Sequence, residues 1–189
     1  MAFTETVETQ RGLVIDPGKL ESLASGSEPL TPTDCMERAE LAALALDVSA
    51  LDREQAGDAV LLWRSESSEA WLNLWWQPRD TGYHDHDGSC VGVYVIEGVA
   101  RNEPLVLGRP RLVHQYEAGD RFAFPAAGIH RMEHDPGAIT IHVYSPPIRS
   151  IGEYELQDGA LVRRSVAPDE PSAPSPVLLG ALAENSRQP

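Results

Sequence analysis

Two histidines separated by one residue are the first side chains in this 189-residue chain whose spacing suggests chemistry. His84 and His86 lie in the stretch YHDHDGSC, beside a turn at Asp87 and Gly88. If this stretch is a β-strand, residues two apart point to the same face, so both imidazoles face one site. Imidazole binds Fe, Zn, Cu and Ni, but the pair alone is equally typical of two histidines on a polar surface turn.

A third histidine favours a shared site. His130 follows Gly119, Pro125 and Gly128 in the stretch GDRFAFPAAGIHRMEH. Glycine and proline mark turns, so we expect His130 to lie on a different strand from the first two histidines. The three imidazoles can converge only if those strands lie side by side in the fold.

The elements that must position these histidines are short strands, which begin near residue 58. Apolar or aromatic runs alternate with turn residues, and Asp158-Gly159 separates two of them as a hairpin turn. Short strands at this density predict an antiparallel sandwich or barrel. The runs are AVLLWR and AWLNLWW, which the polar SESSE joins as a predicted hairpin, followed by CVGVYVIEG, AITIHVYSPP and GEYELQDGALVRRS.

The segments on either side of these strands differ in composition. Within residues 1–57, an Ala-, Leu- and Glu-rich stretch has Thr31 and Thr33 as candidate N-caps and apolar residues at spacings of three and four. We therefore expect one or two helices that form an N-terminal cap on a strand domain of residues 58–166. Residues 167–189 are rich in Pro, Ser and Ala, which predicts a loosely ordered extension.

Charge and composition argue against several classes of function. Acidic residues outnumber basic ones, 29 to 15, so the formal net charge is −14, and we expect no nucleic-acid partner. The longest apolar run, LAALAL, is too short to span a bilayer, so we expect no membrane partner. Because the chain has two cysteines, Cys35 and Cys90, and no recognisable signal peptide, we expect reduced thiols and a cytoplasmic location. We also expect a monomer or a homodimer.

Two motifs resemble those of the cupin superfamily. The first runs from the His-x-His pair to a closing glycine, here Gly98, and the second runs from Gly119 through Pro125 to a histidine. The histidine positions of the two motifs are occupied by His84, His86 and His130. The resemblance implies an all-β cupin jelly-roll barrel of antiparallel strands, in agreement with the strand pattern.

A closer resemblance is to the cysteine dioxygenase family of thiol dioxygenases, and it is carried by HDHDGSCVGVYVIEG, GIHRMEH and ITIHVYSPP. That family lacks the usual cupin glutamate, and the corresponding position here is Val91, which cannot bind metal. The resemblance implies that His84, His86 and His130 hold iron(II). It also implies that both atoms of O2 are added to the sulfur of a small thiol, such as cysteine or 3-mercaptopropionate, to give a sulfinic acid.

The third of these stretches carries three polar residues at i, i+2 and i+4. Thr140, His142 and Tyr144 would share one face of a strand. The family has a Ser-His-Tyr relay here, so the resemblance implies that Tyr144 reaches the substrate and oxygen while His142 and Thr140 support it. Without the resemblance, these residues also fit an ordinary barrel interior with satisfied polar tips.

Two positions depart from the family pattern. The cysteine that some members cross-link to the relay tyrosine aligns with Val91, one residue after Cys90. A shift of one residue turns a strand side chain to the opposite face, so we expect Cys90 to point away from the metal. His134 stands where the second motif usually has asparagine, and we interpret it as a surface histidine.

The arginine that binds the substrate in this family has no counterpart at the same position here. The position of the family's amino-acid-binding arginine is occupied here by Leu62 or Ala59. Arg64 lies two residues beyond Leu62 and hence on the same strand face, where its guanidinium could bind a carboxylate. A solvated strand-end arginine is the alternative, and four nearby tryptophans could then line a pocket for a different thiol.

Two other functions stay open on the sequence. One is a cupin module that binds a small ligand without turnover. The other is a metal-cupin enzyme that uses Zn, Ni or Mn on a substrate other than a thiol. Val91 together with the alternation of Thr140, His142 and Tyr144 favours dioxygenation over both, since a binding module needs no relay tyrosine.

Overall fold

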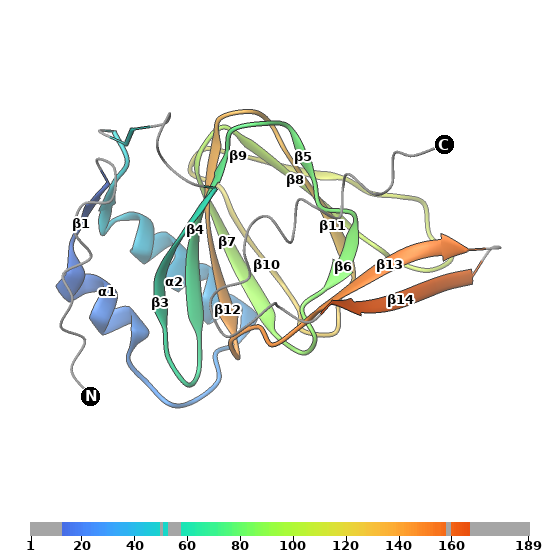
Figure 1. Ribbon diagram of the computed structural model, residues 1–189, viewed down its shortest axis with the longest axis horizontal. Coiled ribbons are helices and arrows are strands. Elements are labelled where there is room, and N and C mark those ends of the chain that lie inside the picture. The colour runs from blue at the N-terminus through green and yellow to red at the C-terminus, as the bar shows by residue number, and fades with distance from the viewer. Residues whose placement is uncertain (1–12, 50, 53–57, 158–159, 167–189) are drawn as a thin grey trace.

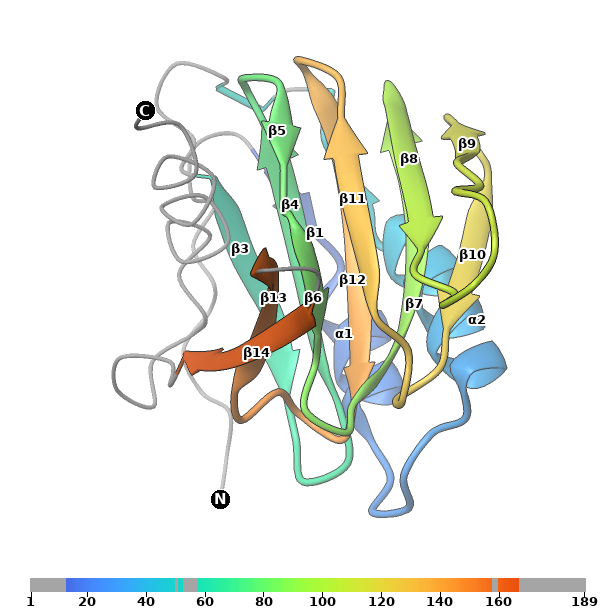
Figure 2. The ribbon, with the colours of Figure 1, turned by 90° about the vertical axis from the view of Figure 1, so that its right-hand side faces the viewer.

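The computed structural model describes residues 13–49, 51–52, 58–157 and 160–166. Within these residues, two antiparallel sheets face each other, and two helices lie against one side of the strands (Figures 1 and 2). The helices are α1 (Pro17–Ala24) and α2 (Pro32–Ala43). The strands are β1 (Val14–Ile15), β2 (Leu46–Asp47), β3 (Ala59–Arg64), β4 (Glu69–Trp75), β5 (Arg79–Asp80), β6 (Tyr83–Asp85), β7 (Cys90–Glu97), β8 (Val99–Pro104), β9 (His114–Glu117), β10 (Arg121–Phe124), β11 (His130–His134), β12 (Ala138–Ser145), β13 (Ile151–Gln157) and β14 (Ala160–Val166).

The strand order is that of a jelly roll made of two separately hydrogen-bonded sheets. One sheet has the order β10-β7-β12-β4-β3, and the other has the order β14-β13-β6-β11-β8-β9, with β5 paired to β11. This arrangement confirms the all-β antiparallel prediction. The predicted β3–β4 hairpin is also confirmed, and β13 pairs with β14 as predicted, although the turn between them lies outside the described residues.

Alternating side chains of the first sheet form two cores. On β4, Leu72 packs with Ile141 and with the helices, whereas Trp71 packs on the inner face with Val93 and Tyr144. Every residue of β4 and β12 is buried, because the helices cover one face and the second sheet covers the other. Two-sided burial explains why these strands read as nearly continuous apolar runs. It also creates the enclosed interior in which polar side chains can be held away from water.

Helix α2 contacts the first sheet at Gly92 of β7. A Cβ atom on Gly92 would lie 2.0 Å from the backbone N of Met36, so only glycine permits this approach. The helix starts at a capping box, in which Thr31 and Asp34 each accept a hydrogen bond from the other's backbone. The N-cap predicted at Thr31 is therefore confirmed, whereas Thr33 lies inside the helix.

The remaining expectations about organisation are only partly addressed by the described residues. No helix among them is long and apolar enough to cross a membrane. The predicted extension of residues 167–189 lies outside the described residues. The division into a cap of residues 1–57 and a strand domain of residues 58–166 stays a prediction.

Candidate metal centre

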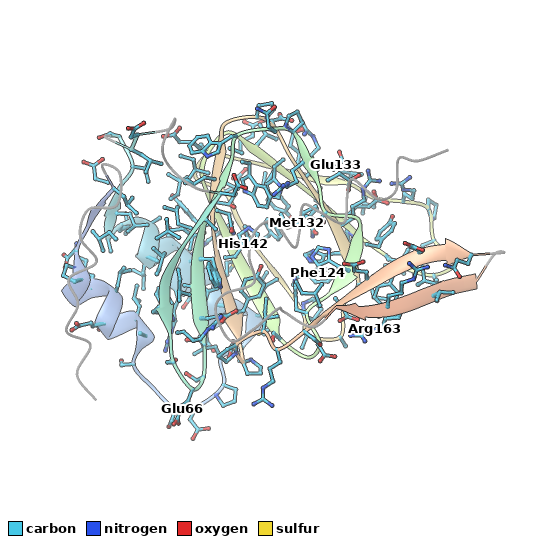
Figure 3. The ribbon with its side chains drawn as sticks, in the orientation of Figure 1. Glu66, Phe124, Met132, Glu133, His142 and Arg163 are labelled. Atoms are coloured by element: carbon cyan, nitrogen blue, oxygen red, sulfur yellow. The ribbon has the colours of Figure 1, made fainter. Side chains whose placement is uncertain are left out.

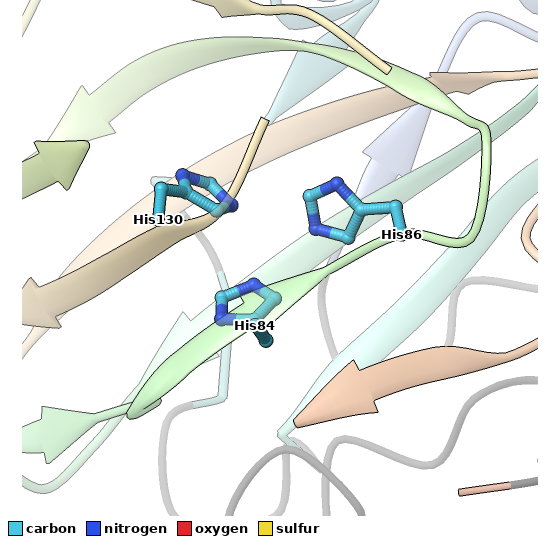
Figure 4. A group of neighbouring side chains, drawn as sticks. All are labelled: His84, His86 and His130. Carbon is cyan, nitrogen blue, oxygen red and sulfur yellow. The ribbon is translucent and has the colours of Figure 1, made fainter. Parts of the chain in front are cut away.

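The three histidines singled out by the sequence come together between neighbouring strands of the second sheet (Figure 4). His84 lies in β6, His86 follows that strand directly, and His130 begins β11. His84 and His130 are direct cross-strand partners. One ligand nitrogen from each ring lies within 4.8 Å of the other two, and all three residues are buried. This cluster could hold a metal ion.

Backbone and side-chain oxygens orient two of these rings. Nδ1 of His84 lies 3.0 Å from the carbonyl oxygen of Gly82, and Nδ1 of His130 lies 2.7 Å from Oδ1 of Asn102. Both oxygens only accept hydrogen bonds, so each Nδ1 carries the hydrogen and donates it. Nε2 of His130 is then left buried with no hydrogen-bond partner among the described residues. A buried acceptor nitrogen aimed into a cluster of imidazoles fits a metal ligand.

Electrostatics also favour metal binding. Burial lowers the pKa of His84, and it lowers the pKa of His86 and His130 well below the ordinary value. The rings are therefore neutral at physiological pH, which is the form that binds a metal. Val91 is buried on the inner face beside Tyr144, its cross-strand partner, and it supplies no carboxylate. A cation held by these neutral rings would keep its full charge.

Asp85, between the first two ligand candidates, connects their strand to the β13–β14 hairpin. Its carboxylate accepts hydrogen bonds from Tyr154 Oη at 2.6 Å and from Arg163 Nε at 2.8 Å. Burial opposes ionisation, but these hydrogen bonds prevail and lower the pKa of Asp85. Arg163 also reaches Asp87 at 3.1 Å, so one guanidinium joins both acidic residues that flank His86. Figure 3 labels Arg163 on strand β14 of the hairpin.

The relay residues predicted on β12 are hydrogen-bonded to one another. His142 Nδ1 lies 3.0 Å from Tyr144 Oη, and His142 Nε2 lies 3.0 Å from Thr140 Oγ1. The Tyr144 ring meets the His86 ring edge-on, with centroids 5.0 Å apart. Burial lowers the pKa of His142 to about 3 and raises the pKa of Tyr144, so both side chains are neutral at pH 7.

Arg64 lies on the inner side of the first sheet. Its Nε is 2.6 Å from Oε2 of the fully buried Glu69, and its guanidinium lies 5.9 Å from the centre of the Trp71 ring. Glu69 is a cross-strand partner of both Arg64 and Tyr144. The guanidinium is therefore at the same end of the interior as the relay tyrosine. Its side chain is 31% exposed, as at the rim of a site.

The two departures from the family pattern have opposite outcomes. Cys90 packs in the outer core, with its Sγ 3.8 Å from Cys35 Sγ, so the prediction that it points away from the histidines is confirmed. The interpretation of His134 as a surface residue was wrong. His134 is 2% exposed and stacks on Trp75, with ring centroids 3.7 Å apart. Its spacing of four from His130 on one strand already indicated the inner face.

Comparison with known proteins assigns the chain to a family. Partial structural similarity is found to KdgF from Halomonas sp. (TM-score 0.41, 19% identity, 47% of this chain and 76% of that chain) and to BH2720 from Bacillus halodurans (0.44, 14%, 58% and 80%). A search of curated proteins found no match. The family model described as cysteine dioxygenase type I matches residues 46–157, which is more than half of the chain. The chain therefore belongs to the cysteine dioxygenase type I family.

Proposed function

We propose that this protein is an iron(II)-dependent dioxygenase that adds both atoms of O2 to the sulfur of a small thiol. The net reaction is RSH + O2 → RSO2H, a sulfinic acid. The observation that carries the proposal is the buried cluster of three neutral imidazoles beside a tyrosine relay, with valine in the place of a carboxylate. Membership of the cysteine dioxygenase type I family supports the same class of reaction.

The proposed metal ligands are His84, His86 and His130. Ferrous iron held there would supply a Lewis-acidic, redox-active centre for the reaction of a thiolate with dioxygen. The partnerless Nε2 of His130 and the absence of a carboxylate from the cluster fit this role among the described residues. Because three neutral rings leave the charge of the cation uncompensated, the site favours an anionic ligand such as a thiolate.

The proposed catalytic group is the hydroxyl of Tyr144, on the first sheet beside His86. It stays protonated because burial, together with the nearby Glu69 carboxylate, raises its pKa. Nδ1 of His142 is hydrogen-bonded to the Tyr144 hydroxyl at 3.0 Å, and Nε2 of His142 is hydrogen-bonded to Oγ1 of Thr140. A hydroxyl fixed in this way can bind the substrate or oxygen and orient it without a loss of side-chain entropy at each turnover.

Arg64 is the proposed anchor for a substrate carboxylate. Its guanidinium is a cation at the same end of the interior as Tyr144, and its Nε is held by Glu69. Arginine forks match carboxylates in geometry and charge. The proposed substrates are therefore small thiols that carry a carboxylate, with cysteine and 3-mercaptopropionate as the first candidates.

The test is oxygen consumption by protein that has been purified anaerobically and loaded with iron(II). Cysteine, 3-mercaptopropionate and cysteamine are supplied in turn. Mass spectrometry then measures whether the product has gained two oxygen atoms. We expect one O2 consumed per thiol, loss of activity in His130→Ala, and normal activity in His114→Ala, whose side chain is exposed. Iron-loaded protein that oxidises no thiol would contradict the proposal and favour a binding module.

The role of Arg64 has its own test. Arg64→Gln is expected to raise KM about 10- to 100-fold for cysteine and 3-mercaptopropionate, since a hydrogen bond to a charged group contributes about 1.5–3 kcal/mol. KM for cysteamine, which has no carboxylate, should stay the same if that thiol is oxidised. An equal rise for a thiol without a carboxylate would instead assign Arg64 a structural role.

A further inference from the structure

A fourth residue extends the relay away from the histidine cluster. Trp75 Nε1 lies 2.9 Å from Oγ1 of Thr140, and Thr140 in turn contacts His142, which contacts Tyr144. All four side chains are buried. The chain of hydrogen bonds therefore runs without solvent from an indole N–H at one end to a phenol beside His86 at the other.

The direction of these hydrogen bonds is determined at the tryptophan end. An indole N–H only donates, so Thr140 Oγ1 accepts from Trp75. The hydroxyl of Thr140 has one hydrogen of its own, and its hydrogen-bond partners among the described residues are Trp75 and His142. Because a buried unpaired donor costs about 1–3 kcal/mol, that hydrogen is donated to Nε2 of His142.

The imidazole ring of His142 then sets the direction of the hydrogen bond to Tyr144. Burial keeps His142 neutral, so one ring nitrogen accepts and the other donates. Since Nε2 accepts from Thr140, the hydrogen of His142 is on Nδ1 and is donated to Tyr144 Oη. The hydrogen of the Tyr144 hydroxyl is not used in this contact, and it can be donated into the space beside the three histidines.

We propose that Trp75 is a positioning residue whose indole N–H makes Tyr144 a hydrogen-bond donor toward the ligands of the three-histidine site. This inference rests on the proposed function for the identity of those ligands, the thiol substrate and oxygen. Trp75 acts on Tyr144 through Thr140 and His142.

The stacking of His134 on Trp75 supports this role. The two rings are nearly parallel, with an interplanar angle of 8°, and the stack holds the indole edge toward Thr140. Phenylalanine at position 75 would keep a stacked ring but remove the donor. Thr140 could then accept from His142 Nε2, and the whole chain could reverse so that Tyr144 donates to His142 instead of to a ligand.

The direct test is the tautomer of His142, measured by 15N NMR on the full-length protein, both metal-free and loaded with diamagnetic zinc. His142→Gln identifies the signals. We expect hydrogen on Nδ1 in the wild type and a mixture of both tautomers in Trp75→Phe. Trp63→Phe is the matched control, because Trp63 Nε1 donates to Ser68 in the outer core, and it should leave the His142 signals unchanged.

Two NMR outcomes would overturn the inference: hydrogen on Nε2 in the wild type, or an unchanged tautomer in Trp75→Phe. The wild-type measurement does not depend on Trp75→Phe, so it decides the direction even if that variant does not fold. Thr140→Val is a second variant that removes the hydroxyl link while it keeps the side-chain volume, and it should also yield a mixture of tautomers.

Steady-state kinetics then test whether the direction of these hydrogen bonds affects turnover. In iron-loaded protein, Trp75→Phe should lower kcat about 10-fold, which is the size of effect seen when a residue that orients a metal-site group is replaced. KM should change less than about 2-fold. A mixed tautomer with unchanged kcat would overturn the positioning role. If the wild type oxidises no thiol, the proposed function fails, but the tautomer measurement still reports the direction of the relay.

Discussion

Acidification of the metal-free protein from about pH 7.5 to about pH 5.5 is expected to lower its free energy of unfolding by several kcal/mol. Burial lowers the pKa of His142 to about 3, and it lowers the pKa of His86, His130 and His134 well below the ordinary 6.5. These imidazoles take up protons more readily in the unfolded chain than in the folded one. The stability that they contribute is complete above pH 6.5 and is lost as the pH falls below it.

The magnitude follows from the difference in bound protons. An unfolded imidazole with a pKa of about 6.5 is mostly protonated at pH 5.5, whereas His142 remains neutral in the fold, so this residue alone costs about 1.4 kcal/mol there. If the other three also remain neutral at that pH, the combined loss is four times as large, about 6 kcal/mol. Such a loss is comparable with the whole free energy of unfolding of a marginally stable domain, about 5–15 kcal/mol.

The assay is urea unfolding of the metal-free protein, followed by tryptophan fluorescence at three pH values and extrapolated linearly to zero urea. His134→Gln should reduce the acid-induced loss by about 1 kcal/mol, because burial holds the pKa of His134 well below its ordinary value, and it removes no candidate ligand. His114→Gln is the matched control, because His114 is exposed on β9, and it should leave the loss unchanged. A free energy of unfolding that stays flat between pH 7.5 and 5.5 would refute this reasoning.

Three further predictions concern packing and the support of the site. Gly92→Ala should cost about 3 kcal/mol by forcing α2 away from β7 and so lower Tm. Gly18→Ala in α1 should leave Tm the same or slightly higher, because its Cβ would make only an ordinary contact, 3.7 Å from Oδ1 of Asp16. Asn102→Ala should weaken metal binding about 10- to 100-fold in a chelator competition, because the histidine that it orients is released; unchanged affinity would exclude this role. Arg163→Gln should speed amide hydrogen exchange in β6 and in the β13–β14 hairpin, because Asp85 of β6 loses the guanidinium that joins it to β14; unchanged exchange there would show that the ion pair does not stabilise these strands.

The features that could be predicted from the sequence are those that depend on the spacing of residue types within one strand or helix. Strands were recognisable because buried runs alternate with turn residues, and the faces of β12 followed from the spacing of two between Thr140, His142 and Tyr144. Cys90 was placed on the outer face by the same reasoning. His134 was misplaced because a polar residue was read as a surface residue, although its spacing from His130 favoured the interior.

The features that could not be predicted depend on register between strands that are distant in sequence. Asn102 reaches His130 across the β8–β11 pair, and nothing in the stretch ARNEP marks that residue as an orienting group. Trp75 reaches Thr140, 65 residues later in the chain, only because β4 and β12 pair in one particular register. Such contacts depend on where a strand is paired, which a single sequence does not encode as a local pattern.

The location of the two cysteines has a consequence for a protein proposed to oxidise sulfur. Cys90 directly precedes Val91, yet its thiol lies behind the five-stranded sheet beside Cys35, whereas the valine faces the tyrosine. The sheet is thus a wall between the protein's own sulfur atoms and the histidine cluster. The Cys90 thiol can reach that cluster as a rival of the substrate only if β7 slips by one residue, and such a slip would break its hydrogen bonds to both neighbouring strands. Cys35 lies on α2, on the far side of the sheet. Protection against self-oxidation is in this way a property of the strand register.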